Sequence, residues 1–323
     1  MSEWLVERGI GEDRAIRVAG DAIVAARVAW EGELLAGSVV SARLVSRHAG
    51  SSRGTARLDD GGEVLVSRLP RDASEGAPLT LEITRTAVGE GRRRKPAQAR
   101  PAAAAPRRLT LADSLALNGE TVRAVHRFPV AGWDEMWTGL TEARVDFAGG
   151  ALLVSPTPAM TLFDIDGTLP PAALSLAAVP ALAETLALWD IGGSIGIDFP
   201  TIEAKADRRT VDDALERALQ DFAHERTAMN GFGFVQIVAR STGPSLLHRC
   251  AQDPVGCAVR LLLRRAERVE GAGTILLTCH PALPAAIRPE WQAELARRTG
   301  RMIRVEPDAA LAPHAAFAQS VPS

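Results

Sequence analysis

Two aspartates that follow apolar, strand-like runs are the residues of this chain best suited to chemistry. Asp164 follows the run 160–163, and Asp198 follows the glycine- and isoleucine-rich run 191–197. A carboxylate at the point where a buried strand reaches solvent is costly to desolvate and is usually kept for a metal ion or for proton transfer. Two such carboxylates brought together can hold one Mg²⁺ and orient a phosphodiester against it. The pattern therefore predicts a metal-dependent enzyme that acts on phosphate esters.

The composition is that of an ordinary globular protein and leaves the partner open. The chain has 323 residues, of which 46% are hydrophobic and 24% charged, and this length suffices for two or three domains. A net charge of −2 neither favours nor excludes nucleic acid, because the local distribution of charge decides binding. Lys95 and Lys205 are the only lysines, so arginine supplies nearly all of the positive charge. Such a bias commonly reflects genome composition, although the guanidinium fork also suits phosphate contacts.

Cysteine usage and the first residues predict a cytoplasmic protein. The start of the chain (1–8) lacks a basic segment followed by an apolar core, so it does not indicate a secretory signal. A small, odd number of cysteines fits a reducing compartment. These cysteines are Cys250, Cys257 and Cys279. The longest apolar stretch, at 174–189, is interrupted by Pro180 and is expected to form a helix within a domain and not a membrane span.

The first ninety residues are predicted to be rich in β-strands. Short alternating segments separated by glycine and aspartate occur at 22–25, 38–45, 62–66 and 79–84. This spacing suggests a small barrel such as an OB fold, a module that often stacks nucleic-acid bases on aromatic side chains. No aromatic residue lies between Trp30 and Phe128, so a barrel that serves only as a scaffold is as well supported as an RNA platform.

An Ala/Pro/Arg tract at 91–108 is predicted to be a linker, because it has no apolar periodicity with which to form a core. It begins with a basic cluster that could contact a phosphate backbone. The cluster consists of Arg92, Arg93, Arg94 and Lys95. Taken alone, it is interpreted first as a solvated connector and second as a weak RNA-binding segment.

From residue 109 the pattern changes to alternating strands and helices. Strands are expected at 147–154, 160–165, 194–198 and 232–238, and helices at 132–141, 172–190 and 208–225. Beyond these, the pattern predicts helices at 245–269 and 290–298 and strands at 274–278 and 301–305. The chain is thus predicted to be an α/β (α+β) multidomain protein. Its expected parts are a β-rich, OB-like RNA-binding module with N-terminal strands at 1–90, a basic linker at 91–108, an α/β catalytic domain at 109–245 and a small α/β subdomain at 246–323.

The sequence Phe-Asp-Ile-Asp-Gly-Thr-Leu at 163–169 resembles the first motif of the haloacid-dehalogenase phosphatases. In that family the first aspartate is the nucleophile and the second the general acid/base, which would assign these roles to Asp164 and Asp166. The lysine that should follow is missing, since none exists after Lys205. The only late acidic pair, at 212–213, lies on a predicted helix and not at a strand end. A phosphatase therefore remains the less favoured alternative.

A wider resemblance runs through much of the chain. It rests on the opening Glu-Trp-Leu-Val-Glu-Arg-Gly-Ile-Gly-Glu, the end of the barrel module, a glycine turn with its strand, the second aspartate motif, and a later Gly-Phe-Gly-Phe-Val-Gln-Ile strand. These segments stand at 3–12, 81–90, 149–161, 191–199 and 231–246. Their order and spacing together resemble the ribonuclease E/G endoribonucleases, in the form of a short, divergent bacterial member.

That resemblance implies a deoxyribonuclease-I-like and ribonuclease-H-like catalytic region that cuts single-stranded RNA. Asp164 and Asp198 would hold Mg²⁺, which activates water for in-line attack on the phosphodiester and leaves a 5′-phosphate and a 3′-hydroxyl. Asp166 takes the position of a family asparagine that helps orient the first aspartate, and it adds a charge near the metal.

The chain also departs from the family pattern. The segment between 107 and 147 is much shorter, so the pocket that senses a 5′-monophosphate is expected to be lost. Ser175 and Trp189 replace a family asparagine and arginine, which should weaken the RNA groove. The Cys-x-x-Cys zinc link between protomers is missing, so structural zinc is not expected and a homodimer stays open.

Two functions follow from these observations. The first is a compact Mg²⁺-dependent endoribonuclease, and the second is a non-catalytic RNA-binding relative that kept the fold. Retention of both aspartates favours the enzyme, because a protein freed from catalysis has little physical reason to keep two costly carboxylates at strand ends.

Overall fold

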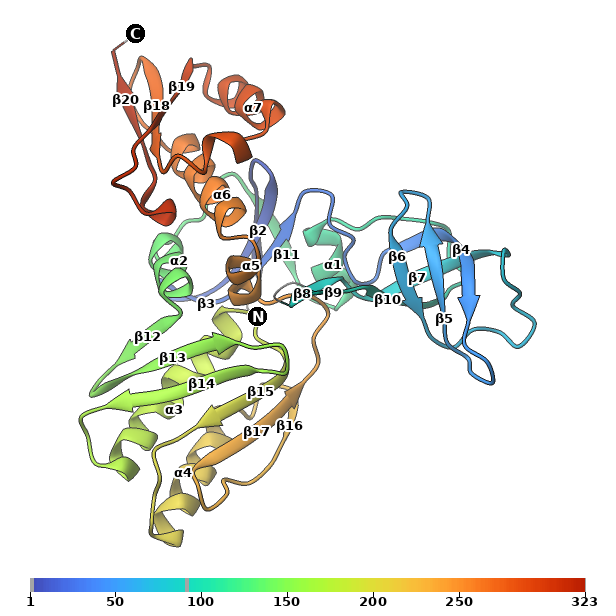
Figure 1. The fold of residues 1–323 in the computed structure, drawn as a ribbon. Helices are drawn as coiled ribbons and strands as arrows, with labels where there is room; N and C mark the ends of the chain where they lie inside the picture. The colour runs from blue at the N-terminus through green and yellow to red at the C-terminus, as the bar shows by residue number, and fades with distance from the viewer. Residues whose placement is uncertain (1–2, 91–92, 323) are drawn as a thin grey trace.

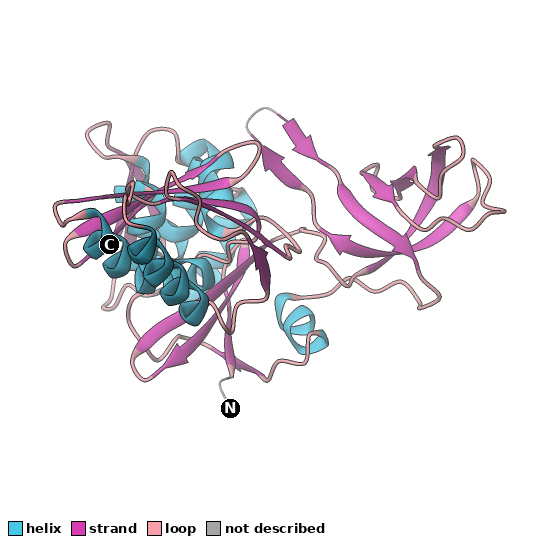
Figure 2. Ribbon diagram, turned by 90° about the horizontal axis from the view of Figure 1, so that it is seen from below, coloured by secondary structure: helices cyan, strands magenta, loops and turns pink. Residues whose placement is uncertain are grey.

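The computed structural model describes residues 3–90 and 93–322, which form several sheets, a barrel and the helices that cover them (Figure 1). Viewed from below, the barrel extends to one side of the molecule, and most of the helices gather on the other side (Figure 2). This mixture of α/β and α+β elements agrees with the expected fold class, and the barrel is consistent with an OB-like module.

A four-stranded N-terminal sheet lies at the centre of the molecule (Figure 1). In the order β11-β1-β2-β3, its strands are Val122–Val125, Trp4–Arg8, Glu12–Ala19 and Ala22–Trp30. One face contributes Leu5, Ile16 and Val28 to the main hydrophobic core, while the other packs against helix α1 (Leu111–Leu117). The strands within residues 4–30 therefore belong to this sheet and not to the barrel.

The barrel is formed by the part of the chain that lies between β3 and α1. Its strands β4, β5, β6, β7 and β10 are Val39–Arg47, Gly54–Leu58, Glu63–Val66, Pro78–Arg85 and Ala97–Pro101. They close in the order β10-β6-β5-β4-β7 around Leu44, Val64, Leu81 and Ile83. Closure removes the exposed strand edges, so the module has a complete core of its own.

Part of the segment predicted as a linker at 91–108 forms strands, which corrects that expectation for residues 93–95 and 97–101. Residues Arg93–Lys95 form β9, which pairs with β8 (Val88–Glu90), and β10 follows directly. Strand β10 pairs with both β6 and β7, and Ala97 and Ala99 point into the barrel with 6% and 0% exposure. Alanine fits there because strand closure leaves little room for larger side chains.

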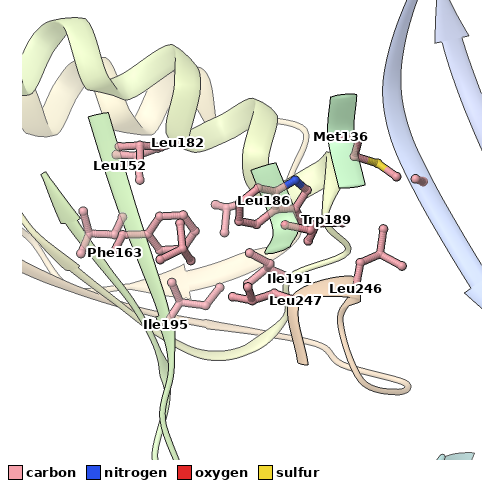
Figure 3. Close-up of a cluster of buried hydrophobic side chains, with 14 of the residues drawn as sticks. Met136, Leu152, Phe163, Leu182, Leu186, Trp189, Ile191, Ile195, Leu246 and Leu247 are labelled. Carbon is pink, nitrogen blue, oxygen red and sulfur yellow. The ribbon is translucent and has the colours of Figure 1, made fainter. Parts of the chain in front are cut away.

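A six-stranded mixed sheet carries both aspartates (Figure 1). In the order β12-β13-β14-β15-β17-β16, its strands are Arg144–Phe147, Gly150–Pro156, Thr161–Gly167, Gly193–Asp198, Phe234–Ala239 and His224–Arg226. Helices α3 (Pro171–Leu188) and α4 (Lys205–Ala218) pack on one face of this sheet. The close-up in Figure 3 shows Phe163 and Ile195 from the sheet beside Leu182 and Leu186 of α3.

Helix α3 is long and apolar enough to cross a membrane by length and composition, with a mean hydropathy of 1.5. Its buried residues include Leu174, Ala178, Leu182 and Leu186, and these pack against the sheet in the main core. The helix therefore acts as a core helix in this fold, as the interruption at Pro180 suggested.

Two predicted helices differ from the observed ones: the first ends earlier, and the second is divided into two. The helix expected at 208–225 stops at Ala218, and His224–Arg226 forms the edge strand β16 instead. The helix expected at 245–269 is divided into α5 (Leu246–Gln252) and α6 (Pro254–Glu267). The division falls at Pro254, which lacks an N–H and opens a new helix whose N-cap is Asp253.

The C-terminal region forms a separate layer at the far end from the aspartate sheet (Figure 1). Strands β18 (Thr274–Cys279), β19 (Ile303–Pro307) and β20 (Phe317–Val321) form a sheet in the order β19-β18-β20. Helices α6 and α7 (Pro289–Thr299) pack on it, while α2 (Trp133–Glu142) lies against α5 near the main core. Strand β20 was not predicted from the sequence.

Buried charged side chains join this C-terminal layer to the N-terminal sheet. Arg14 is fully buried and pairs with Glu7 and Glu12, and Arg264 pairs with Asp134 at 3.0 Å and with Glu7 at 3.5 Å. Burial, together with the charge of Arg14, lowers the pKa of Arg264 to about 9, so this side chain stays protonated at neutral pH. Because Glu7 contacts several buried arginine side chains, its carboxylate is central to the packing of the C-terminal layer against the N-terminal sheet.

Replacing Glu7 with glutamine should destabilise the protein strongly. The amide cannot compensate the charges of Arg14 and Arg264, so we expect a loss of about 3–5 kcal/mol in the free energy of unfolding. Urea titration followed by circular dichroism measures this loss.

The matched control is Glu63→Gln, because Glu63 forms an exposed ion pair with Arg57 on the barrel at 3.2 Å. We expect that change to alter stability by less than about 1 kcal/mol. Equal effects of the two substitutions would contradict the role assigned to Glu7.

Candidate active site

Asp164 and Asp198 lie opposite each other on neighbouring parallel strands. Strands β14 and β15 pair in a register that places Asp164 against Asp198. Neighbouring strands are about 4.8 Å apart, and residues paired in register point to the same face of a sheet. Both side chains are exposed on the face that α3 and α4 leave uncovered. The structure thus brings the two sequence-predicted aspartates together at one point.

Asp166 lies on the same face of β14, because it stands two residues after Asp164. Between and beside these carboxylates, Phe163, Ile165 and Ile197 point the other way into the core, each no more than 5% exposed. The alternation explains the local sequence: apolar residues anchor the strands under the helices, and the aspartates in between reach solvent. Asp166 is about 7 Å further along the strand, as the Cα spacing of a strand requires.

Apolar side chains border the aspartates on this face. Leu153 stands beside Asp164, and Phe234 stands beside Asp198 in the adjacent strands. A side chain at Gly196 would lie 2.7 Å from Phe234 Cζ and 2.8 Å from Met160 Sδ, so glycine is required there for these two residues to pack over the strand. The open face is therefore partly apolar and partly acidic.

An arginine also shares this face. Arg144 on β12 pairs with Leu153, which in turn pairs with Asp164, so all three stand in one row across the sheet. The row places Arg144 about 10 Å from Asp164, two strands away. Its guanidinium is exposed and pairs with Asp146 at 2.7 Å. Arg144 was not predicted from the sequence, because an isolated arginine in a short edge strand carries no motif.

The three carboxylates have no partner among the described side chains, which give none of them a hydrogen bond or an ion pair. Asp212 differs, since it pairs with Arg226 and accepts a hydrogen bond from the Met229 N–H at 3.2 Å. Asp212 is therefore occupied in holding α4 to the sheet. Uncompensated like charges close together favour a bound cation.

The two carboxylates fit Mg²⁺ better than they fit a metal ion that takes all of its ligands from protein side chains. Within residues 3–90 and 93–322, no three or more His, Cys, Asp or Glu side chains converge on one point. Mg²⁺ commonly uses one or two carboxylates and completes its octahedron with water and substrate phosphates. Asp164 and Asp198 supply those two carboxylates on an accessible surface.

A large cleft lies away from the aspartates. It has a volume of about 1190 Å³ and lies between the ends of β1 and β11 and the C-terminal ends of α6 and α7. Its lining includes Arg8, Arg127 and Arg298 with Glu7 and Glu267. Cavity size usually points to a small-molecule site, but the aspartates instead occupy an open face, which suits a polymer that lies across the sheet.

One residue of the basic cluster reaches the aspartate sheet. A cavity of about 240 Å³ is lined by Arg85 and Lys95 together with Ser194 at the start of β15. The Thr86 N–H donates to the Thr242 carbonyl at 2.9 Å and fixes the end of the barrel against this region. Along β15, Ser194 is about 13 Å from Asp198. Arg93 and Arg94 lie on β9, and Arg92 lies outside the described residues.

Ser175 and Trp189, expected in the RNA groove, lie in the core. Ser175 is 0% exposed and donates to the Pro171 carbonyl at 2.8 Å within α3, while Trp189 is 2% exposed. Figure 3 shows Trp189 among Leu186, Ile191 and Leu246. Neither residue faces the aspartates, so the substitutions at these positions do not alter the open face.

The cysteines are buried free thiols. The side chains of Cys250 and Cys257 are close enough to hydrogen-bond, and this contact together with burial raises the pKa of Cys257. Burial likewise raises the pKa of Cys279. A raised pKa keeps the thiol protonated, whereas zinc binds the thiolate.

Sequence comparison connects this chain to ribonuclease G. It is 31% identical to ribonuclease G of Escherichia coli K12 over 143 residues, which are 40% of this chain and 29% of that protein. The ribonuclease G proteins of Shigella flexneri and Salmonella typhimurium SL1344 match at the same identity over the same length. The match thus spans less than a third of these relatives. No family model matches the chain.

These similarities support a relationship to the ribonuclease E/G family, as the motifs of the sequence indicated. The related proteins are ribonucleases by name, so the chain is related to enzymes that cut RNA.

Substituting either aspartate should weaken metal binding. We expect Asp164→Asn and Asp198→Asn each to lower the affinity for Mg²⁺ or Mn²⁺ at least about tenfold, because each removes one of two charged ligands. Isothermal titration calorimetry measures the affinity of each variant.

Asp207→Asn is the control, since Asp207 is an exposed carboxylate on α4, the helix on the opposite side of the sheet. Unchanged metal affinity in both strand variants would exclude the pair as the metal site.

Proposed function

We propose that this protein is a Mg²⁺-dependent endoribonuclease that hydrolyses phosphodiesters of single-stranded RNA. The observation that carries the proposal is the register of β14 and β15, which sets Asp164 beside Asp198 on an open sheet face. The similarity to ribonuclease G supports RNA as the substrate. The fold alone would not distinguish this activity, since function depends on the site.

Asp164 and Asp198 would hold the metal ion through one carboxylate each. When bound, Mg²⁺ would neutralise charge on the phosphodiester and help water attack it in line with the leaving oxygen. The two strands position these carboxylates before substrate arrives, because their neighbours Phe163 and Ile197 are fixed in the core. The products would be a 5′-phosphate and a 3′-hydroxyl, as in the related family.

Asp166 would act as a positioning residue and not as a third ligand. It lies on the face of Asp164 but about 7 Å along the strand, so its negative charge attracts the cation without reaching it directly. Arg144, which stands two strands away in the row of Asp164, could pair with a phosphate of the RNA if it releases Asp146.

The open face offers a path for an extended strand of RNA. At one end Arg85 and Lys95 line a cavity beside the start of β15, and at the other end the same strand finishes at Asp198. Positive charge at the entrance and carboxylates at the far end suit a phosphate chain that runs along β15. An open, unenclosed face admits an internal segment of RNA, which is what an endonuclease requires.

The phosphatase alternative gains little support from this arrangement. Its acidic partner would have to come from the pair at 212–213, yet Asp212 is held by Arg226. The non-catalytic alternative stays distinct, because an RNA-binding relative would bind RNA without cutting it.

Cleavage of an end-labelled, AU-rich single-stranded RNA tests the proposal. We expect internal cuts that require Mg²⁺, and we expect Asp164→Asn and Asp198→Asn each to lower kcat at least about 100-fold. Asp207→Asn should retain full activity.

Two other outcomes would identify a different function. RNA that is bound but left whole would identify a binding relative. Hydrolysis of p-nitrophenyl phosphate that depends on Asp164 and Asp166, without cleavage of RNA, would identify a phosphatase.

Asp166→Asn should shift the metal requirement while leaving the reaction intact. Removing one exposed negative charge that acts across water on a divalent cation about 7 Å away weakens the attraction by about 1 kcal/mol, or roughly fivefold. We expect the half-saturating Mg²⁺ concentration to rise by that factor, with kcat at saturating Mg²⁺ largely kept. Complete loss of cleavage at every Mg²⁺ concentration would show that Asp166 participates directly.

A further inference from the structure

Phe232 is a large apolar side chain exposed beside the aspartates. It is 81% exposed, more than any other large hydrophobic side chain in the described part of the chain. Phe234, two residues later, pairs with Asp198, and the Phe199 N–H donates to the Gly233 carbonyl at 3.2 Å. Phe232 therefore stands just beyond the end of β15 that carries Asp198.

The loop that presents Phe232 is held rigidly. The Asn230 side-chain oxygen accepts hydrogen bonds from the N–H groups of Phe232 at 2.9 Å and Phe234 at 3.0 Å. The Gly233 N–H donates to the Asn230 carbonyl at 3.2 Å. Gly233 has φ +90°, and a side chain there would lie 2.4 Å from the Phe199 carbonyl oxygen, so only glycine allows this approach. The ring is thus held outward on a loop that has little freedom left to lose.

Strand β17 presents two further apolar side chains on the open face of the sheet. Phe234 and Val238 point to this face, and Val238 is 52% exposed. Val238 pairs with Ser194, which lines the cavity beside Lys95. The open face of β17 therefore carries Phe234 and Val238, with the polar and exposed Gln236 between them, next to β15.

The barrel supplies no comparable surface. Its residues contain no aromatic side chain, since none occurs between Trp30 and Phe128. Phe317 is 41% exposed, but it lies on β20 in the C-terminal layer. Single exposed apolar residues are common, so exposure alone carries no argument. The inference depends instead on the rigid loop and on the position of Phe232 beside Asp198.

We propose that Phe232 is a stacking platform for a nucleobase of single-stranded RNA next to the cut phosphodiester. The inference rests on the proposed function, to which it adds a substrate subsite. A base stacked on the ring would anchor the nucleotide that follows the phosphate held at Asp164 and Asp198. Stacking tolerates every base, because each has a π-face, so this subsite contributes affinity for unpaired RNA without reading sequence.

The test compares Phe232→Ala, Phe232→Trp and the control Phe317→Ala in the intact 323-residue chain. Stacking on an aromatic residue contributes about 1–3 kcal/mol per base, so Phe232→Ala should raise KM for single-stranded RNA by about 5- to 150-fold. We expect Phe232→Ala to change kcat less than threefold. Phe232→Trp should keep the native KM, and Phe317→Ala should leave both constants unchanged. Thermal unfolding checks that each variant is folded.

A second readout separates this inference from the proposed activity. In the Asp164→Asn background, binding of an RNA that carries 2-aminopurine should quench its fluorescence, and adding Phe232→Ala should abolish the quenching and weaken binding by the same factor. If the native chain cuts RNA but Phe232→Ala leaves KM and quenching unchanged, the stacking platform is wrong and the activity stands. If the native chain never cuts RNA but quenching depends on Phe232, the activity is wrong and the platform stands. A fall in kcat with KM unchanged would overturn the platform.

Discussion

The parallel pairing of β14 with β15 is the constraint on which the site depends. In the observed register Asp164 stands against Asp198, and both point away from the helices. A slip of one residue would turn the carboxylates into the core and bring Phe163 or Ile197 to the surface. Burial of those apolar residues under α3 and α4 therefore fixes the relative position of the aspartates, and the hydrophobic core determines the chemistry of the open face.

The other parts of the molecule frame this sheet. The N-terminal sheet shares its core, and the barrel is anchored to it through the Thr86–Thr242 hydrogen bond. The C-terminal layer is joined through Glu7 and the buried arginines around it. One side of the sheet is thus covered by packed helices while the other stays open, and Lys95 lies at the start of the strand that ends in Asp198.

The sequence predicted the aspartate strands well because their signal is local. An apolar run that ends in aspartate shows both the buried strand and its exposed end. Strand β10 was missed because Ala97 and Ala99 have low strand propensity and become buried only when the barrel closes around them. The early end of α4 was missed because Phe222 continues the apolar period after the chain has left the helix. Neither the burial of Trp189 nor the exposure of Phe232 could be predicted, since tertiary packing sets both.

The central claim is that Asp164 and Asp198 share one divalent cation. A crystal soaked in Mn²⁺ and measured at the manganese absorption edge tests it most directly. We expect one anomalous peak within about 2.0–2.3 Å of a carboxylate oxygen from each aspartate. A peak at other residues, or none at this pair in crystals that hold Mn²⁺ elsewhere, would contradict it.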